Sequence, residues 1–146
     1  MGLQRRGAHS YADSQSDLRE ELLDYSVRNS YPAAHFADAA CGCGGRLFRL
    51  LVDDTVGAAL RRCAACGAEH PIGDSGEYLD EASLDECECP CGNDSFEVTV
   101  GVALYRDSDA VRWIYLGCRC PRCSLAACYA DWKNEHDDYR ELLRLV

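Results

Sequence analysis

A short cysteine-containing segment occurs twice in this chain. Residues 40–52 read ACGCGGRLFRLLV and residues 88–100 read ECPCGNDSFEVTV, so the two copies start 48 residues apart. A second cysteine pair follows each copy after a strand-like run. The pattern predicts an internal duplication, in which each unit carries two cysteine pairs. The matched positions are Cys41, Cys43, Gly44, Phe48 and Val52 in the first copy and Cys89, Cys91, Gly92, Phe96 and Val100 in the second.

Eleven cysteines favour metal binding over disulfide formation. No apolar run is long enough to cross a membrane, and the N-terminus lacks the apolar stretch of a signal peptide, so we expect a cytoplasmic protein. Disulfides are rare in that compartment, and an odd number of cysteines leaves one thiol unpaired. Structural zinc is commonly held by four thiolates from two closely spaced pairs.

The spacing therefore predicts two Zn²⁺ ions per chain, one in each unit. Glycine follows three of the four cysteine pairs, where its tolerance of positive φ suits a tight turn, and Ser124 follows the fourth. Cys118 remains an alternative to Cys120, because CRCPRC offers both spacings. The expected ligands are Cys41, Cys43, Cys63 and Cys66 for the first site, and Cys89, Cys91, Cys120 and Cys123 for the second.

The order of cysteine pair, hairpin and cysteine pair resembles the zinc ribbon class. The resemblance covers residues 41–67 and 89–123 and implies a small, metal-bound, mainly β fold with two tandem zinc ribbons. Both units open with C-x-C-G, whereas zinc ribbons usually open with C-x-x-C. The CPCG at residues 89–92 is also similar to the start of the SEC-C zinc motif, which closes with a different spacing.

The remaining segments complete the expected organisation. Residues 13–29 predict an amphipathic helix capped by Ser14 or Ser16, and residues 46–62 and 94–117 alternate like hairpins. Near the C-terminus, Trp132, His136, Tyr139 and Leu143 fall at helical spacing. The expected domains are an N-terminal helical extension (1–40), a first ribbon (41–67), an acidic linker (68–88), a second ribbon (89–123) and a C-terminal amphipathic helix (124–146).

Three cysteines, Cys87, Cys118 and Cys128, have no counterpart in the first unit. The simplest interpretation is that they are small buried apolar side chains. A third metal site formed by these three with His136 is an alternative. Zinc-bound thiolates can also be oxidised, so a redox switch is a further hypothesis.

The residue types argue against an enzyme. Four thiolates close the coordination sphere of zinc, whereas a catalytic zinc keeps one position open. The sequence contains no His-Glu-x-x-His, nucleophile elbow or phosphate-binding glycine loop. We therefore expect no catalytic residues.

Charge favours a protein partner over nucleic acid. The chain has a formal net charge of −10, and residues 68–88 contain eight acids and no lysine or arginine. Two tetrathiolate zinc sites would take the total to about −14. We expect a protein-interaction module that acts as an adaptor, regulator or inhibitor of a basic partner. Nucleic-acid binding is the alternative, because arginines gather near both sites, although a negative field opposes phosphate contacts.

Overall fold

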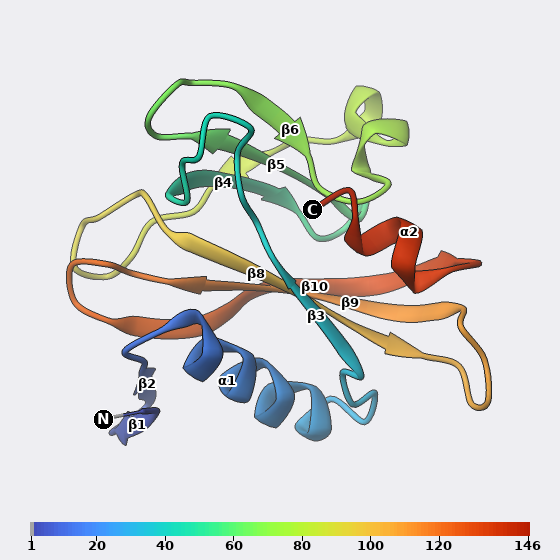
Figure 1. Cartoon of the computed structure of the whole chain (residues 1–146), viewed down its shortest axis with the longest axis horizontal. Helices are drawn as coiled ribbons and strands as arrows, with labels where there is room; N and C mark the ends of the chain where they lie inside the picture. The colour runs from blue at the N-terminus through green and yellow to red at the C-terminus, as the bar shows by residue number, and fades with distance from the viewer. Residues whose placement is uncertain (1) are drawn as a thin grey trace.

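Two antiparallel sheets and one long helix form three layers. The computed structural model describes residues 2–146, and Figure 1 shows α1 on one face of the larger sheet and the smaller sheet on the other. The larger sheet has the strand order β1-β2-β10-β9-β8-β3, and the smaller has β6-β5-β4-β7. The elements are β1 (Gln4–Arg6), β2 (His9–Tyr11), α1 (Gln15–Arg28), β3 (His35–Asp38), β4 (Phe48–Asp53), β5 (Ala58–Cys63), β6 (Glu69–Pro71), η1 (Ser75–Glu77), η2 (Leu79–Glu81), β7 (Asp85–Glu86), β8 (Glu97–Leu104), β9 (Val111–Arg119), β10 (Leu125–His136) and α2 (Tyr139–Leu143).

The main core lies between the two sheets. Successive residues of a strand point to opposite faces, so Ile114 and Leu116 of β9 face the smaller sheet, whereas Tyr115 faces α1. The buried side chains of this core include Phe48 and Leu50 from the smaller sheet. The apolar interior is therefore shared by both cysteine-containing units.

Helix α1 begins and approaches the sheet for identifiable reasons. Ser14 is its N-cap, and its side chain accepts a hydrogen bond from the backbone N–H of Asp17. Leu22 packs directly on Gly117 of β9, where a Cβ atom would lie 2.8 Å from a Leu22 methyl carbon. A larger residue at Gly117 would hold the helix away from the sheet.

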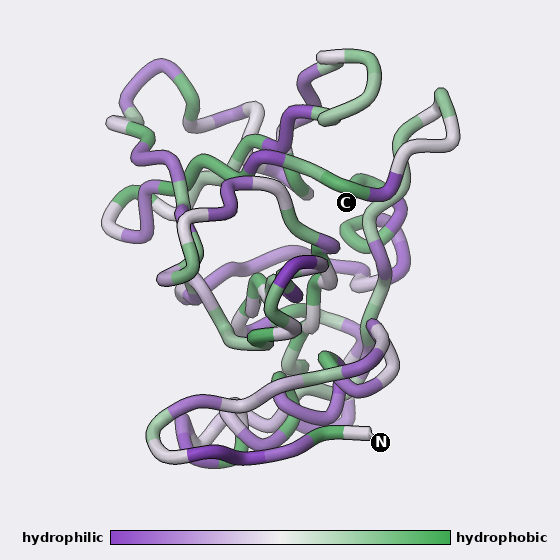
Figure 2. Tube along the Cα trace, turned by 90° about the vertical axis from the view of Figure 1, so that its left-hand side faces the viewer, coloured by the Kyte–Doolittle hydropathy of each residue, from purple (hydrophilic) through white to green (hydrophobic). Residues whose placement is uncertain are grey.

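The N-terminal 40 residues contribute strands as well as the expected helix. β2 pairs with β10 at one side of the larger sheet, and β3 pairs with β8 at its edge. β1 is exposed throughout, and Figure 2 shows it as a hydrophilic projection close to the N-terminus. Through these three strands the segment is integrated into the larger sheet and is not an added extension.

The expected C-terminal helix over residues 124–146 is wrong for most of its length. Leu125–His136 form β10, which pairs with β9 along nearly its full length, and only Tyr139–Leu143 are helical. The helical spacing of Trp132 and His136 does not exclude a strand. The preceding residues 125–130 are mostly apolar, and such a run suits a strand buried on both faces.

Residues 68–88 fold against the smaller sheet instead of forming a separate linker. β6 pairs with β5 at one edge of this sheet, and β7 pairs with β4 at the other. Between them, the Ser75 hydroxyl accepts a hydrogen bond from the Ala59 backbone N–H at 2.9 Å, and Asp53 accepts one from the Ser83 N–H at 2.9 Å. The acidic residues are thus held on an ordered surface.

Candidate metal centres

The first four predicted ligands converge at one end of the smaller sheet. Cys41 and Cys43 lie in the turn before β4, Cys63 is the last residue of β5, and Cys66 follows in the next turn. The Sγ atoms of Cys41 and Cys66 are 3.6 Å apart, as are those of Cys43 and Cys63. All four Sγ atoms lie within 4.8 Å of one another. We refer to this group as site one.

The second four predicted ligands form an equivalent group, site two, at one end of the larger sheet. Cys89 and Cys91 precede β8, and Cys120 and Cys123 follow β9. The Sγ atoms of Cys89 and Cys123 are 3.5 Å apart, and those of Cys91 and Cys120 are 3.6 Å apart. The cluster contains Cys120 and not Cys118, so the geometry favours Cys120 as the ligand.

The turns of the two sites use the same backbone hydrogen bonds at matched positions. The Gly44 N–H donates to the Cys41 carbonyl oxygen at 2.9 Å, and the Gly92 N–H donates to the Cys89 carbonyl oxygen at 2.8 Å. Gly44 and Gly92 have φ angles of 93° and 95°, which explains why glycine occupies this position in both copies.

The geometry fits a tetrahedral metal. A zinc ion with Zn–S bonds of about 2.3 Å has S···S edges of about 3.8 Å, close to the distances in both clusters. A disulfide would instead need an S–S distance of about 2.05 Å, and the cysteines are free thiols. The two four-cysteine clusters are therefore compatible with tandem zinc-binding units, in which four thiolates would complete the coordination sphere.

One thiol in each cluster has a lowered pKa and therefore ionises more readily than a free cysteine. Backbone N–H groups of Cys66 and Ala65 lower the pKa of Cys63 to about 6. For Cys120, burial alone would raise the pKa. Hydrogen bonds from the backbone N–H groups of Cys123 and Arg122 outweigh this effect and contribute to a lowered pKa of about 6. The first cysteine of the second pair is thus the favoured initial thiolate in both sites, and thiolate is the form that binds metal.

A second thiol in each cluster has a raised pKa. The Gly45 N–H lowers the pKa of Cys43, but the neighbouring thiols of Cys41 and Cys63 raise it more, to about 12. Burial is the main cause that raises the pKa of Cys89 to about 12. A bound cation would favour the ionised form of these thiols, so metal binding and proton release would be coupled.

Two further residues act on the clusters: Asn93, which the sequence did not single out, and Arg61, one of the arginines that the sequence places near site one. The Asn93 side-chain amide donates to the Cys120 Sγ atom at 3.4 Å. Arg61 is only 6% exposed and lies beside site one, where its guanidinium donates to the carbonyl oxygens of Ala40 and Val146. Its charge would offset part of the negative charge of thiolates at Cys41 and Cys63 when a metal is bound. No sequence motif marks Asn93.

The three remaining cysteines do not form a third Cys/His cluster within residues 2–146. Cys118 is fully buried, and burial raises the pKa of its thiol well above the usual value. Cys128 packs on the α1 side of the sheet, whereas Cys87 and Cys118 pack on the other side. The His136 Nδ1 atom accepts a hydrogen bond from the Asp138 backbone N–H. The larger sheet thus separates the members of the alternative third site.

Comparison of the chain with protein-family models, curated proteins and solved structures finds no significant match. None of the helices in residues 2–146 has both the length and the apolar character that crossing a membrane requires.

Proposed function

We propose that this chain is a non-enzymatic zinc protein with two structural Zn²⁺ ions in zinc-ribbon-like units, and that it binds a basic protein partner through the acidic surface formed by residues 68–88. The observation that carries the proposal is a group of four exposed carboxylates on this surface that form no ion pair within residues 2–146. Glu77, Asp80, Glu81 and Asp85 are exposed. Within the described part of the chain, none of them has a cation within ion-pair distance.

A structural role for the metals follows from the ligand set. Four thiolates leave no open position for a substrate or a reactive water. Both clusters also lie where a sheet ends, so a metal would tie two turns of the chain together. Native mass spectrometry tests the metal content, and we expect two zinc ions per chain; any other metal, or fewer than two ions, would contradict this part of the proposal.

A matched pair of variants tests the acidic surface. The first variant carries Glu77→Gln, Asp80→Asn and Glu81→Gln, and the control carries Glu20→Gln, Asp107→Asn and Asp137→Asn. Both variants lose three exposed negative charges, but only the first changes the proposed docking surface. In affinity capture from the native host, we expect the first to lose its basic partner and the control to retain it. Equal recovery would argue against electrostatic docking at this surface.

Ion pairing also disfavours the nucleic-acid alternative. Arginines near the two sites are largely engaged within the protein: Arg49 lies 2.9 Å from Asp94, and Arg119 lies 2.8 Å from Glu97. Arg62 lies 2.7 Å from Glu69. A gel-shift titration with single- and double-stranded DNA and RNA at low salt tests this alternative, and we expect no shift.

A further inference from the structure

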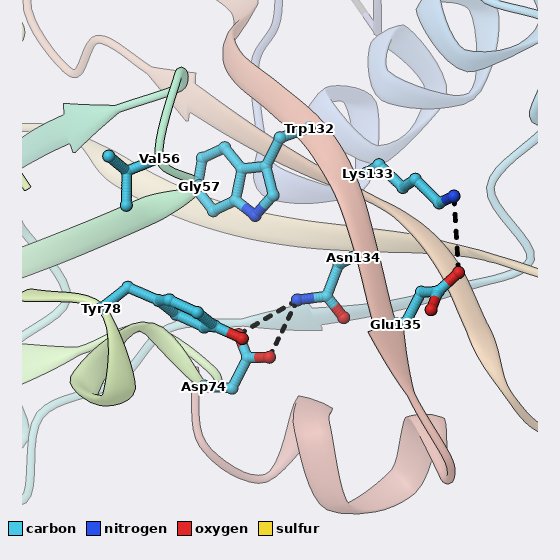
Figure 3. Close-up of a pocket in the computed structure, with 8 residues that line it drawn as sticks. All are labelled: Val56, Gly57, Asp74, Tyr78, Trp132, Lys133, Asn134 and Glu135. Carbon is cyan, nitrogen blue, oxygen red and sulfur yellow. Dashed lines mark hydrogen bonds and ion pairs between the residues drawn. The ribbon is translucent and has the colours of Figure 1, made fainter.

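A small pocket opens where the acidic surface meets strand β10. Its volume is about 170 Å³, and its lining includes Gly57, Asp74, Tyr78, Trp132 and Asn134. Figure 3 shows Trp132 and Asn134 on the same side of β10 as Tyr78 and Asp74. The volume is below the range of about 300–1,000 Å³ that is usual for drug-sized ligands, so the pocket suits the end of a single side chain.

Asp74 and Asn134 form one wall of the pocket, and this wall has more hydrogen-bond acceptors than donors. The Asn134 amide nitrogen donates to both carboxylate oxygens of Asp74, at 3.0 and 3.1 Å. Asn134 is only 7% exposed, and its side-chain oxygen has no hydrogen-bond partner. No ion pair involves Asp74 among residues 2–146. The accessible acceptor on this wall is the Asp74 carboxylate, whose only side-chain donor in the described chain is the Asn134 amide, so a charged donor from a ligand would be favourable.

Aromatic side chains form the other walls. Trp132 is 7% exposed and packs on Gly57, where a Cβ atom would lie 3.0 Å from the indole Cδ1 atom. Tyr78 is 38% exposed at the rim of the pocket. The faces of such rings attract cations, most strongly when water is excluded.

The charges around the pocket are mainly negative. Glu77, Asp80 and Glu81 follow Asp74 along the same segment. Lys133 is the cation in the lining, and its ammonium group lies 3.4 Å from the Glu135 carboxylate. Figure 3 shows these two side chains on the opposite side of β10 from Trp132 and Asn134. Lys133 therefore does not neutralise the Asp74 carboxylate, which can form an ion pair with a cation from a ligand.

We propose that this pocket binds the guanidinium group of an arginine on the protein partner. The inference rests on the proposed function, because it names the anchoring residue of a basic partner. A guanidinium is planar and carries five N–H donors, so it can donate to Asp74 and stack on an aromatic ring at the same time. A lysine ammonium would satisfy the charge but would not stack in this way.

The two tryptophans allow a direct test by NMR. The indole N–H of Trp132 reports on the pocket, and that of Trp113, which donates to Asp131 and packs with Tyr31 on the α1 side of the sheet, serves as an internal control. The probe is the peptide acetyl-Gly-Arg-Gly-amide. We expect a saturable shift of the Trp132 signal without a comparable shift of the Trp113 signal, and about tenfold weaker binding of the lysine peptide.

Matched variants separate the pocket from the general negative field. Asp74→Asn should weaken binding of the arginine peptide by about tenfold or more, because it removes a charged acceptor. Asp85→Asn removes the same charge from an exposed position outside the pocket and should leave the affinity within about twofold. Tyr78→Ala, at the exposed rim, should weaken binding without loss of folding.

Specific outcomes would overturn the inference. Equal affinity of the Asp74→Asn and Asp85→Asn variants would show only non-specific attraction, and so would equal binding of a citrulline peptide. The test is also separate from the test of the proposed function. If Asp74→Asn retains the partner while the triple variant of the acidic surface loses it, the arginine pocket is wrong and the interaction role stands. If the peptide binds but the triple variant retains the partner, the arginine pocket stands and docking through Glu77, Asp80 and Glu81 is wrong.

Discussion

The two cysteine-containing units share one turn geometry but differ in the structure attached to it. Strands β4 and β5 of the first unit have six residues each, and about half of those residues are buried. Strands β8 and β9 of the second unit have eight and nine residues, and six in each are buried. The second hairpin lies between α1 and the smaller sheet, so it has an apolar interior on both faces. Metal binding is therefore expected to matter more for the first unit than for the second.

The largest difference is expected from cysteine substitution. Cys43→Ser and Cys91→Ser should each reduce the metal content from two ions to one, because structural zinc contributes about 10–16 kcal/mol in small domains. Cys43→Ser should also remove hydrogen-exchange protection from β4 and β5, whereas Cys91→Ser should leave β8 to β10 protected. Native mass spectrometry and hydrogen exchange measure these outcomes. Equal loss of protection in both sheets would contradict the comparison.

The next largest effect is expected at the contact between the units. Phe48 and Phe96 are both fully buried, so Phe48→Ala and Phe96→Ala should each lower the free energy of unfolding by about 3–5 kcal/mol. Urea unfolding of the metal-bound protein measures this. Leu47→Ala is the control, because Leu47 is 37% exposed and should cost less than about 1 kcal/mol. If either substitution left the free energy of unfolding nearly unchanged, that phenylalanine would not contribute to the contact between the two units.

A smaller effect is expected at the matched pair Gly45 and Asn93. Asn93→Gly removes the donor to Cys120 and should weaken metal binding at site two by about 10–100-fold. Gly45→Asn should not improve site one, because a Cβ atom there would lie 2.7 Å from the Cys63 Sγ atom. Competition with a chelator measures both, and the unchanged site in each variant is the internal control. Tighter binding in Gly45→Asn would contradict the prediction.

The smallest effect is expected at Gly67 and Ser124, which follow the second cysteine pairs. Their φ angles are 77° and 71°, and a left-handed conformation is strained for serine but not for glycine. Ser124→Gly should raise the free energy of unfolding by up to about 1 kcal/mol, and Gly67→Ser should lower it by a similar amount. Thermal unfolding of the two reciprocal variants checks the signs, and shifts in the same direction would argue against a strain difference.

The two cysteine groups could be predicted from the sequence because the requirement is local. A tetrahedral ion needs closely spaced sulfurs in tight turns, and such turns leave a readable spacing with glycine beside it. Arg61 could be placed near site one by its closeness to Cys63 in the sequence, but its burial and its hydrogen bonds could not be predicted, and the role of Asn93 could not be identified. Asn93 reaches Cys120 only through the fold, because the two residues are far apart in the sequence.

β10 and the acidic segment show what local patterns miss. Trp132 and His136 have helical spacing, yet pairing with β9 places them in a strand, since long-range pairing outweighs a weak periodicity. β7 has two residues and β6 has three, and such short strands exist only because β4 and β5 offer edges to pair with. The high acidity of this segment suggests a linker, although charge alone does not prevent a backbone from pairing.

The position of Phe48 and Phe96 has a consequence for metal uptake. These residues match each other in the two copies, and each donates its backbone N–H to the carbonyl oxygen of the other at 2.8 Å. Each lies a few residues after the first cysteine pair of its own site. Metal binding at one site would order one of these two phenylalanines and, through their shared hydrogen bonds, the other. The chain would then lose less conformational entropy when the second site binds its ion. Species with a single ion should therefore be scarce in a metal titration.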